Sequence, residues 1–413
     1  MAGIILRETA NVNARSRWFQ EIFGFEESCG NMDAYLATKS KFTLENDGDE
    51  IILRSTERDG KEFPVGKFFT PTLDELRQRG AVAIAARPTG AVGGISVEHL
   101  AVGDALELHA ANPGGVFLAA SQFNCLEFPT RYAFPEQGVS GYSYDMTQGP
   151  ACALACAGGT VYRNYFAKVP VGEGMQEGQT REAQLNTLSK LEELVSASPS
   201  PKTVGGAGTE QEEEEKEKEP FWVIDSGYSR TTLKGMDRLA SRLAEFAPED
   251  MEAMLMGSVA VGVQENVGVT FADRQFQPLL GGRNGIRVTQ VYASALCLQD
   301  ADEEVRRASA VLGKLVLHAA YEAALWAGML FGKAPDNHTQ ETTSTPAEPP
   351  KVFVTLLGEG VFKNDPLWIA DALGRAVVRL GGQGVRVKVV VCHHKKIDSG
   401  FKTALAAAMK RYF

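Results

Sequence analysis

Two glycine-rich turns carry the residue types best suited to binding an anion. The first is residues 112–115, NPGG, and the second is residues 358–365, GEGVFKND. Glycines let a backbone bend tightly and approach a ligand closely, and successive N–H groups in such a turn form an anion-binding nest. A helix that begins after the turn adds unpaired N–H groups and a positive dipole end, which favour a phosphate or a carbonyl oxygen.

Each turn is a weak motif when it is taken alone. The first is more often an ordinary corner between a strand and a helix. The second is not a P-loop, because no Gly-Lys-Ser/Thr follows, and it is not a dinucleotide fingerprint, because the third glycine and a downstream acidic residue are missing. It does follow a predicted strand and precede a predicted helix, which is where α/β sheets place ligands.

Several carboxyl groups could supply acid–base chemistry. Glu265 and Asp273 belong to residues 264–274, which we expect to form a loop between two core strands. Glu127 lies three residues after Asn124 in a predicted helix and therefore on nearly the same face. Two further candidates stand elsewhere in the chain: Asp145 and Asp225. For any single one of these groups, a solvated or capping role is commoner than catalysis.

Alternating strands and helices must position these groups. We expect strands at 50–55, 81–86, 103–111, 160–166, 286–297, 351–357 and 385–391, and helices at 116–128, 303–331 and 367–380. A strand, a helix and a second strand over residues 351–391 imply a crossover connection and two parallel strands. The pattern therefore predicts an α/β fold.

Composition excludes some classes of function. The chain has 413 residues and a formal net charge of -10, which leaves no surplus of Lys and Arg for general nucleic-acid binding. Its six cysteines form no CxxC pair, so we expect free thiols, no metal site and no cofactor. No apolar run is long enough to cross a membrane, and the first residues lack the apolar core of a signal peptide. We expect a cytoplasmic protein, with a nuclear location as the alternative.

The domain organisation has two predicted parts. Residues 1–80 form a lead-in packed on the core, and residues 81–413 form the ligand-binding domain. Residues 196–220, SASPSPKTVGGAGTEQEEEEKEKEP, contain too few apolar residues to offset chain entropy, so they predict a disordered insertion. Residues 336–350 predict a polar linker.

Two glycine-rich turns on two strands of one sheet resemble the arrangement of a macrodomain. The first segment is similar to the stretch that holds the distal ribose of ADP-ribose, and to the poly(ADP-ribose) glycohydrolase signature, in which GGV precedes Gln-Glu-Glu on a helix. The second is similar to the family's diphosphate loop. The stretches ASQFNCLEF, TQGPACALACAGGTVYRNYF and VTQVYASAL also resemble MavL-type macrodomain ADP-ribosylhydrolases, over most of the chain.

The resemblance implies a three-layer α/β/α fold around a mixed sheet, and a protein that binds ADP-ribose or an ADP-ribosylated protein. It implies hydrolysis of the bond from the distal ribose to a protein side chain, and arginine is the side chain that the resemblance suggests. The ligand-binding residues that it implies are Asn112, Gly114, Gly115, Gln122, Asn124, Gly358, Glu359, Gly360, Val361 and Phe362.

One departure from the family pattern bears on catalysis. Phe123 and Asn124 stand where the glycohydrolase signature has two carboxylates, and neither can be a general acid. A hydrolase would take its acids from elsewhere, with Asp273 and Glu265 first and Glu127 next. The alternative is a binding module that recognises ADP-ribose without chemistry. An enzyme acting on another nucleotide-like ligand and a structural protein with a vestigial pocket are further alternatives. The sequence leaves the oligomeric state open.

Overall fold

A computed structural model describes residues 17–48, 50–87, 93–145, 147–197, 220–247, 250–279, 281–334 and 348–413. The predicted insertion at 196–220 and the predicted linker at 336–350 lie almost wholly outside these residues. The boundary predicted at residue 80 falls within helix α3 (Leu73–Ala85).

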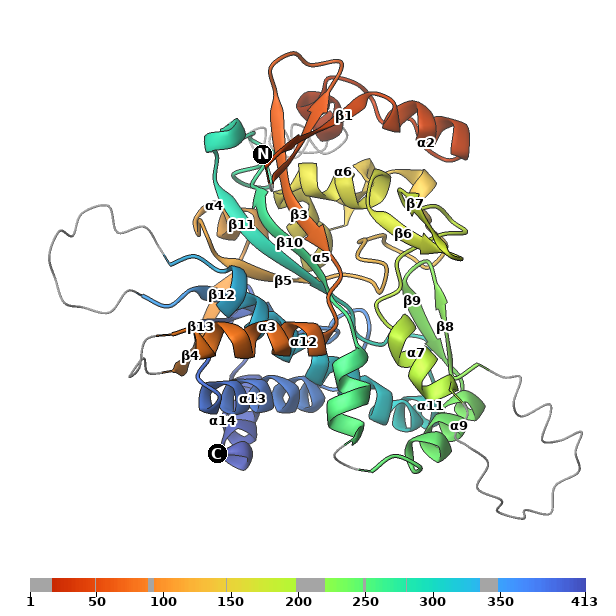
Figure 1. Ribbon diagram of the computed structural model, residues 1–413, viewed down its shortest axis with the longest axis vertical. Helices are drawn as coiled ribbons and strands as arrows, with labels where there is room; N and C mark the ends of the chain where they lie inside the picture. The colour runs from red at the N-terminus through yellow and green to blue at the C-terminus, as the bar shows by residue number, and fades with distance from the viewer. Residues whose placement is uncertain are drawn as a thin grey trace, which may run out of the picture.

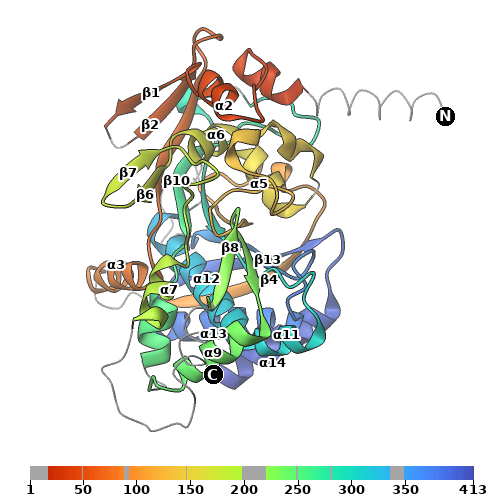
Figure 2. The ribbon, with the colours of Figure 1, turned by 90° about the vertical axis from the view of Figure 1, so that its right-hand side faces the viewer.

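The centre of the described chain is a nine-stranded mixed sheet (Figure 1). Five neighbouring strands are parallel: β11 (Arg287–Ala293), β5 (Val116–Ala120), β12 (Lys351–Thr355), β13 (Arg386–His394) and β4 (Gly94–Val102). Four antiparallel strands extend the sheet beyond β11: β10 (Gly262–Gly268), β3 (Glu62–Phe69), β2 (Glu50–Ser55) and β1 (Phe42–Asp47). Both views place β1 and β2 at the opposite end of the molecule from α13 and α14 (Figures 1 and 2).

Helices cover both faces of the parallel strands. One face packs on α3, α12 (Ala310–Phe331) and α13 (Pro366–Gly382), with α14 (Ser399–Tyr412) against α13. The other packs on α4 (Ala105–Ala110), α5 (Gln148–Ala155) and α6 (Ala157–Tyr165). Strand β5 shows the reason, because Val116 and Leu118 point into the first layer and Phe117 and Ala119 into the second. The predicted three-layer α/β/α class is confirmed.

Shorter elements surround this core. They are α2 (Met32–Lys39), α7 (Ser189–Ser196), α9 (Leu233–Leu243), α11 (Glu303–Ala308), the hairpins β6–β7 (Lys168–Val171, Gly174–Glu177) and β8–β9 (Trp222–Asp225, Tyr228–Thr231), and the single turns η1 (Pro135–Gln137), η2 (Ser140–Tyr144), η3 (Met251–Met256) and η4 (Gly282–Asn284).

Predictions for the last third of the chain are confirmed, and several earlier ones are wrong. Strands β11, β12 and β13 and helices α12 and α13 occur where expected, as does β2. Residues 81–86 and 103–111 contain helix rather than strand, and so do residues 160–166. Residues 116–120 form a strand rather than the start of a helix. A short apolar run buried on both faces does not alternate, so its periodicity cannot distinguish the two states.

Candidate functional site

A pocket of about 390 Å³ opens where the parallel strands end. Its walls come from the ends of β5 and β13, the start of α5, and the turn after β12. Such a place, outside the carboxyl ends of parallel strands, is where open α/β sheets bind ligands. Its lining residues include Ser121, Thr147, Gln148, Gly149, Gly358, Glu359, Gly360, Val361, Phe362, His393 and Asp398.

The turn after β12 is built to expose its backbone. Gly358 has φ +81, and a Cβ there would lie 2.5 Å from the Ala295 Cβ, so only glycine fits. Asn364 closes the turn by donating its N–H to the Gly358 carbonyl at 2.9 Å and its Nδ2 to the Leu296 carbonyl at 2.7 Å. The N–H groups of residues 360 and 361 have no partner among the described residues. They form a nest suited to an anion.

The start of α5 forms another wall. The Gln148 side chain accepts the Ala120 N–H at 2.8 Å and donates to the Leu118 carbonyl at 2.9 Å, which fastens the helix to the end of β5. A Cβ on Gly149 would lie 1.9 Å from the Ala120 carbonyl oxygen. The close approach of helix and strand therefore requires glycine at this position.

The substitution Gly149→Ala tests that packing. The added methyl group must displace backbone, so the free energy of unfolding is expected to fall by about 1–3 kcal/mol. Urea unfolding followed by circular dichroism measures the change. Gly141→Ala is the control, because nothing lies within 4 Å of its added Cβ. Equal stability of the two variants would contradict the close contact.

Ionisable groups gather at the β13 end of the pocket. His393 is 3% exposed, and its Nδ1 accepts the Asp398 N–H at 3.2 Å. The proton of the neutral ring is then on Nε2, which donates to His99 Nδ1 at 2.8 Å. Burial lowers the pKa of both histidines. Burial, followed by the charge of Asp398, raises the pKa of Glu359.

Only one of the two predicted turns belongs to this pocket. All five residues from Gly358 to Phe362 line it. Gly114 and Gly115 instead precede β5, whose Val116 pairs with Val352 near the start of β12. The length of β5 separates the two turns by on the order of 20 Å. The predicted pairing of the two turns across one cleft is therefore wrong. It assumed that a strand ended at the first turn, whereas β5 begins there.

Asn112 lies in the first turn, and its Nδ2 donates to the Leu108 carbonyl at 2.9 Å.

Gln122 and Asn124, which follow β5, are buried in the protein and do not line the pocket. Gln122 donates to the Phe128 carbonyl, and Asn124 donates to Gln184 at 2.7 Å while accepting the Leu126 N–H. They lie in a loop and not in the predicted helix.

Glu127 is the centre of a buried ionic network behind the pocket wall. One carboxylate oxygen accepts from the Ser121 hydroxyl at 3.0 Å, and the other pairs with Arg163 at 3.0 Å. The side chains of both ion-pair partners are 0% exposed. Arg163 also lies 3.8 Å from the centre of the Tyr292 ring and donates to the Cys125 carbonyl. Glu127 does not line the pocket itself, but its side chain contacts two residues that do, Ser121 and Gly149.

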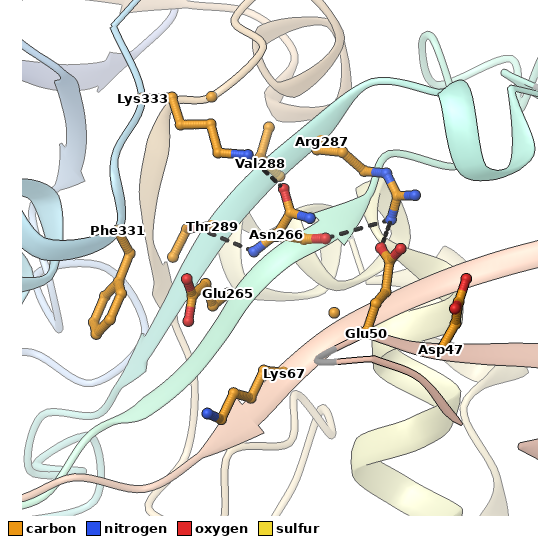
Figure 3. A pocket seen from close by; sticks show the side chains of 12 residues that line it. Asp47, Glu50, Lys67, Glu265, Asn266, Arg287, Val288, Thr289, Phe331 and Lys333 are labelled. Carbon is orange, nitrogen blue, oxygen red and sulfur yellow. Dashed lines mark hydrogen bonds and ion pairs between the residues drawn. The ribbon is translucent and has the colours of Figure 1, made fainter. Parts of the chain in front are cut away.

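The two first-choice acids lie apart from each other. The Asp273 carboxylate accepts the Gln275 N–H in its own turn, and the adjacent Arg274 lines a cavity of about 80 Å³ that adjoins the pocket. Glu265 lies in β10 rather than in a loop, and it lines a different pocket of about 400 Å³ at the amino end of β5 and β11 (Figure 3).

Sequence reasoning missed several residues that line the main pocket. Thr147, Gln148 and Gly149 open the small-residue run TQGPACALACAGG, which signalled close backbone packing without indicating its partner. His393 lies toward the end of β13 and Asp398 follows the strand; the run HHKK there is ordinarily a strand end that emerges into solvent, so it predicted no site. The described residues contain no cluster of three or more His, Cys, Asp or Glu side chains that could hold a metal ion. No helix in the same part of the chain is long and apolar enough to cross a membrane.

Comparisons with known proteins give similarity at the level of structure only. No family model matches the chain, and no curated protein matches its sequence. Poly(ADP-ribose) glycohydrolase from Deinococcus radiodurans, in complex with ADP-ribose, is 11% identical with a TM-score of 0.38, over 84% of this chain and 95% of that chain. The enzyme from Thermomonospora curvata is 14% identical with a TM-score of 0.35, over 84% of this chain and 85% of that one. At TM-scores below 0.5, these similarities decide neither the family nor the activity of this chain.

Proposed function

We propose that the pocket at the carboxyl ends of the parallel strands binds ADP-ribose, and that the protein hydrolyses ADP-ribosyl linkages to protein side chains, with arginine as the acceptor. The observation that carries the proposal is the exposed nest of the 358–362 turn inside a pocket of about 390 Å³. That volume lies in the range of small-molecule sites. The choice of ADP-ribose rests on the sequence resemblance of this turn to a macrodomain diphosphate loop.

The diphosphate would accept hydrogen bonds from the backbone N–H groups of Gly360 and Val361. Its negative charge would also face the start of α5, where the helix dipole is positive. The rest of the ligand would extend along the pocket toward His393 at one end and Ser121 at the other, since both line it.

Two carboxyl groups in the pocket could supply the chemistry. The pKa of Glu359 is raised by burial and by Asp398, whereas the pKa of Asp398 is lowered, first by the N–H of Phe401. Carboxyl groups whose pKa values are pushed apart are suited to separate acid and base roles. Glu359 would protonate the leaving nitrogen as the C1″–N bond breaks. Asp398 would act as the base and accept a proton from the water whose oxygen bonds to C1″. Asp273 is the alternative acid, because its neighbour Arg274 lines the adjoining cavity.

A non-catalytic ADP-ribose reader is the second candidate. It is favoured by one observation: Asp273, Glu265 and Glu127, the acids implied by the sequence, do not line the pocket. Binding requires only the nest and the shape of the pocket, whereas hydrolysis also requires a competent acid.

Release of ADP-ribose from an ADP-ribosylated arginine peptide separates the candidates. Wild-type protein is expected to release it, and Glu359→Gln is expected to lower kcat by about 10²–10⁴-fold, the usual contribution of a general acid. Affinity for ADP-ribose, measured by calorimetry, should change little. Because the protonated form of Glu359 is the active one, the rate should fall as pH rises through its raised pKa, and this limb should vanish in the variant.

Other outcomes reassign the role. Tight binding without release would support the reader. Loss of release in Asp273→Asn but not in Glu359→Gln would move the acid to Asp273. If wild-type protein bound no ADP-ribose, both functions would be rejected.

A further inference from the structure

A pair of histidines joins β13 to the edge strand β4 beside the pocket (Figure 1). His393 in β13 lines the pocket, whereas His99 in β4 does not. His99 is paired with Val391 in the parallel register, so His393, two residues further along β13, projects from the same face. The ring centres are 5.1 Å apart, and His99 Nδ1 lies 2.8 Å from His393 Nε2. The two rings are therefore in hydrogen-bonding contact across the strands.

His393 also holds the chain that follows β13. Its Nδ1 accepts the backbone N–H of Asp398 at 3.2 Å, and the ring of Phe401 in α14 packs edge-on against it at 6.0 Å between ring centres. Asp398 caps α14, because its Oδ1 accepts the Phe401 N–H at 2.9 Å. His393 therefore fixes the backbone of a residue that lines the pocket.

Each of these two nitrogen–nitrogen contacts has room for one hydrogen only. A neutral imidazole has one N–H group and one acceptor nitrogen. The Asp398 N–H occupies the contact with His393 Nδ1, so the ring proton of His393 is on Nε2 and points at His99 Nδ1. An added proton must go to one of the two Nδ1 atoms, and either choice places two hydrogens in one contact. Transfer of a proton between the rings only moves the conflict. Both hydrogen bonds therefore exist only while both rings are neutral.

The surroundings of the pair decide where it titrates. Burial lowers the pKa of His99, and the neighbouring His393 and Lys402 lower it further. Burial also lowers the pKa of His393, against the opposing charge of Asp398. Both folded-state values thus lie below the ordinary histidine value of 6.5, so the two hydrogen bonds are fully formed above pH 6.5 and are lost as pH falls through the lowered values. Other charged or titratable groups that line the pocket or the adjoining cavity near the pair are Glu359, His394, Lys396 and Arg274.

We propose that His99 and His393 form a proton-sensitive latch, which holds Asp398 in place while both rings are neutral and releases it when one ring is protonated. With a hydrogen on Nδ1, His393 no longer accepts the Asp398 N–H. It would donate to the Asp398 carboxylate instead, and so withdraw that carboxylate from the pocket. His99 is then a positioning residue, which acts through His393. The effect on reaction rate rests on the proposed role of Asp398 as the base, whereas the effect on the Asp398 backbone does not.

Hydrogen–deuterium exchange of the Asp398 amide in the full chain tests the latch without a ligand. Mass spectrometry measures the exchange rate, which is corrected for the intrinsic effect of pH. Protection in wild-type protein is expected to fall by about tenfold between pH 7.5 and pH 5.0, because one hydrogen bond is lost. His393→Asn should remain protected at both pH values, since its Oδ1 takes the place of Nδ1 and does not titrate.

Variants of His99 test its positioning role. His99→Asn should be protected as wild type is at pH 7.5, because Asn Oδ1 still accepts from His393 Nε2. At pH 5.0 it should lose less protection, since the partly exposed ring is gone and only the buried His393 is left to titrate. His99→Leu should lose protection already at pH 7.5, because the ring proton of His393 is then free to move to Nδ1. His394→Asn changes an exposed neighbouring histidine and should behave as wild type does.

Three results would overturn the latch. They are equal protection of wild-type protein at the two pH values, a pH dependence in His393→Asn as large as in wild type, and identical behaviour of His99→Asn and His99→Leu. The wild-type comparison decides the question even if a His393 variant does not fold.

Release of ADP-ribose separates the latch from the proposed function. The ratio of the His99→Asn rate to the wild-type rate is expected to be near one at pH 7.5 and to rise to about tenfold at pH 5.0. Titration of Glu359 affects both proteins and cancels in this ratio. A constant ratio would overturn the effect of the latch on catalysis. Absence of release at every pH would reject the hydrolase, and the exchange of the Asp398 amide would still decide the latch.

Discussion

Arg163→Met is expected to lower the free energy of unfolding by about 3–5 kcal/mol, because it leaves a buried carboxylate without its counter-ion. The pair with Glu127 is 0% exposed on both sides, and Arg163 donates in addition to the Cys125 carbonyl and to Tyr292. Methionine fills much of the same volume, so the loss comes from charge rather than from a cavity. Urea unfolding at fixed pH measures it.

The loss of stability in Arg163→Met is expected to increase as pH rises. Burial raises the pKa of Glu127, and Arg163 opposes that rise. Without Arg163 the folded-state pKa rises further above the unfolded value, so the folded state binds more protons. Stability must then fall as pH rises. The variant should therefore be closest to wild type near pH 5 and furthest from it near pH 8.

Two further variants isolate the ion pair. The double variant Glu127→Gln, Arg163→Met should recover part of the lost stability, because it no longer buries an unpaired carboxylate. Arg230→Met removes an exposed pair with Asp225 and should change stability by less than about 1 kcal/mol. A loss as small as this in Arg163→Met, with no change in pH dependence, would show that the buried pair contributes little.

Gly360→Glu is expected to weaken ADP-ribose binding by at least about a hundredfold, equivalent to about 2.7 kcal/mol. The new side chain would fill the nest and place a negative charge against the diphosphate. Folding should be affected little, because nothing lies within 4 Å of a Cβ at this position and its φ is not in the left-handed region. Calorimetry with ADP-ribose and thermal unfolding measure the two effects separately.

Two further variants separate the effect of side-chain size and charge at residue 360 from the effect of an added charge elsewhere. Gly360→Ala adds one methyl group without charge and should weaken binding less than Gly360→Glu. Gly141→Glu adds the same charge where nothing lies within 4 Å, away from the pocket lining, and should bind as wild type does. Full affinity in Gly360→Glu would place the ligand elsewhere on the protein.

The sequence predicted the second turn better than the first, for a physical reason. Strand β12, its turn and α13 are contiguous, and each carries its own local signal: β-branched apolar residues, glycines, and a proline at the start of the helix. Residues 116–120, VFLAA, carry no such signal, because a strand covered on both faces has the same apolar composition as a buried helix. The error at this one strand reversed the direction of the first turn.

The roles of the carboxylates also could not be predicted from the sequence. Their residue types indicated acid–base chemistry, but the sequence could not tell a paired acid from a free one. Glu127 meets Arg163 in the core, whereas Glu265 is turned into a separate pocket by a bulge in β10. Neither partner nor bulge has a signature in the surrounding residues.

By itself, the sequence determined the α/β class, the parallel β12–β13 unit and the glycine-rich turn that follows β12, because all of these depend on residues close together in the chain. The tertiary structure decided which groups face that turn: the start of α5, His393 and Asp398, with Glu359 from the turn itself. It also moved the NPGG turn and Glu265 to a second pocket at the opposite edge. Strand order and burial set these placements. They bring together segments that are far apart in the sequence, and the local pattern of one segment carries no information about its partner.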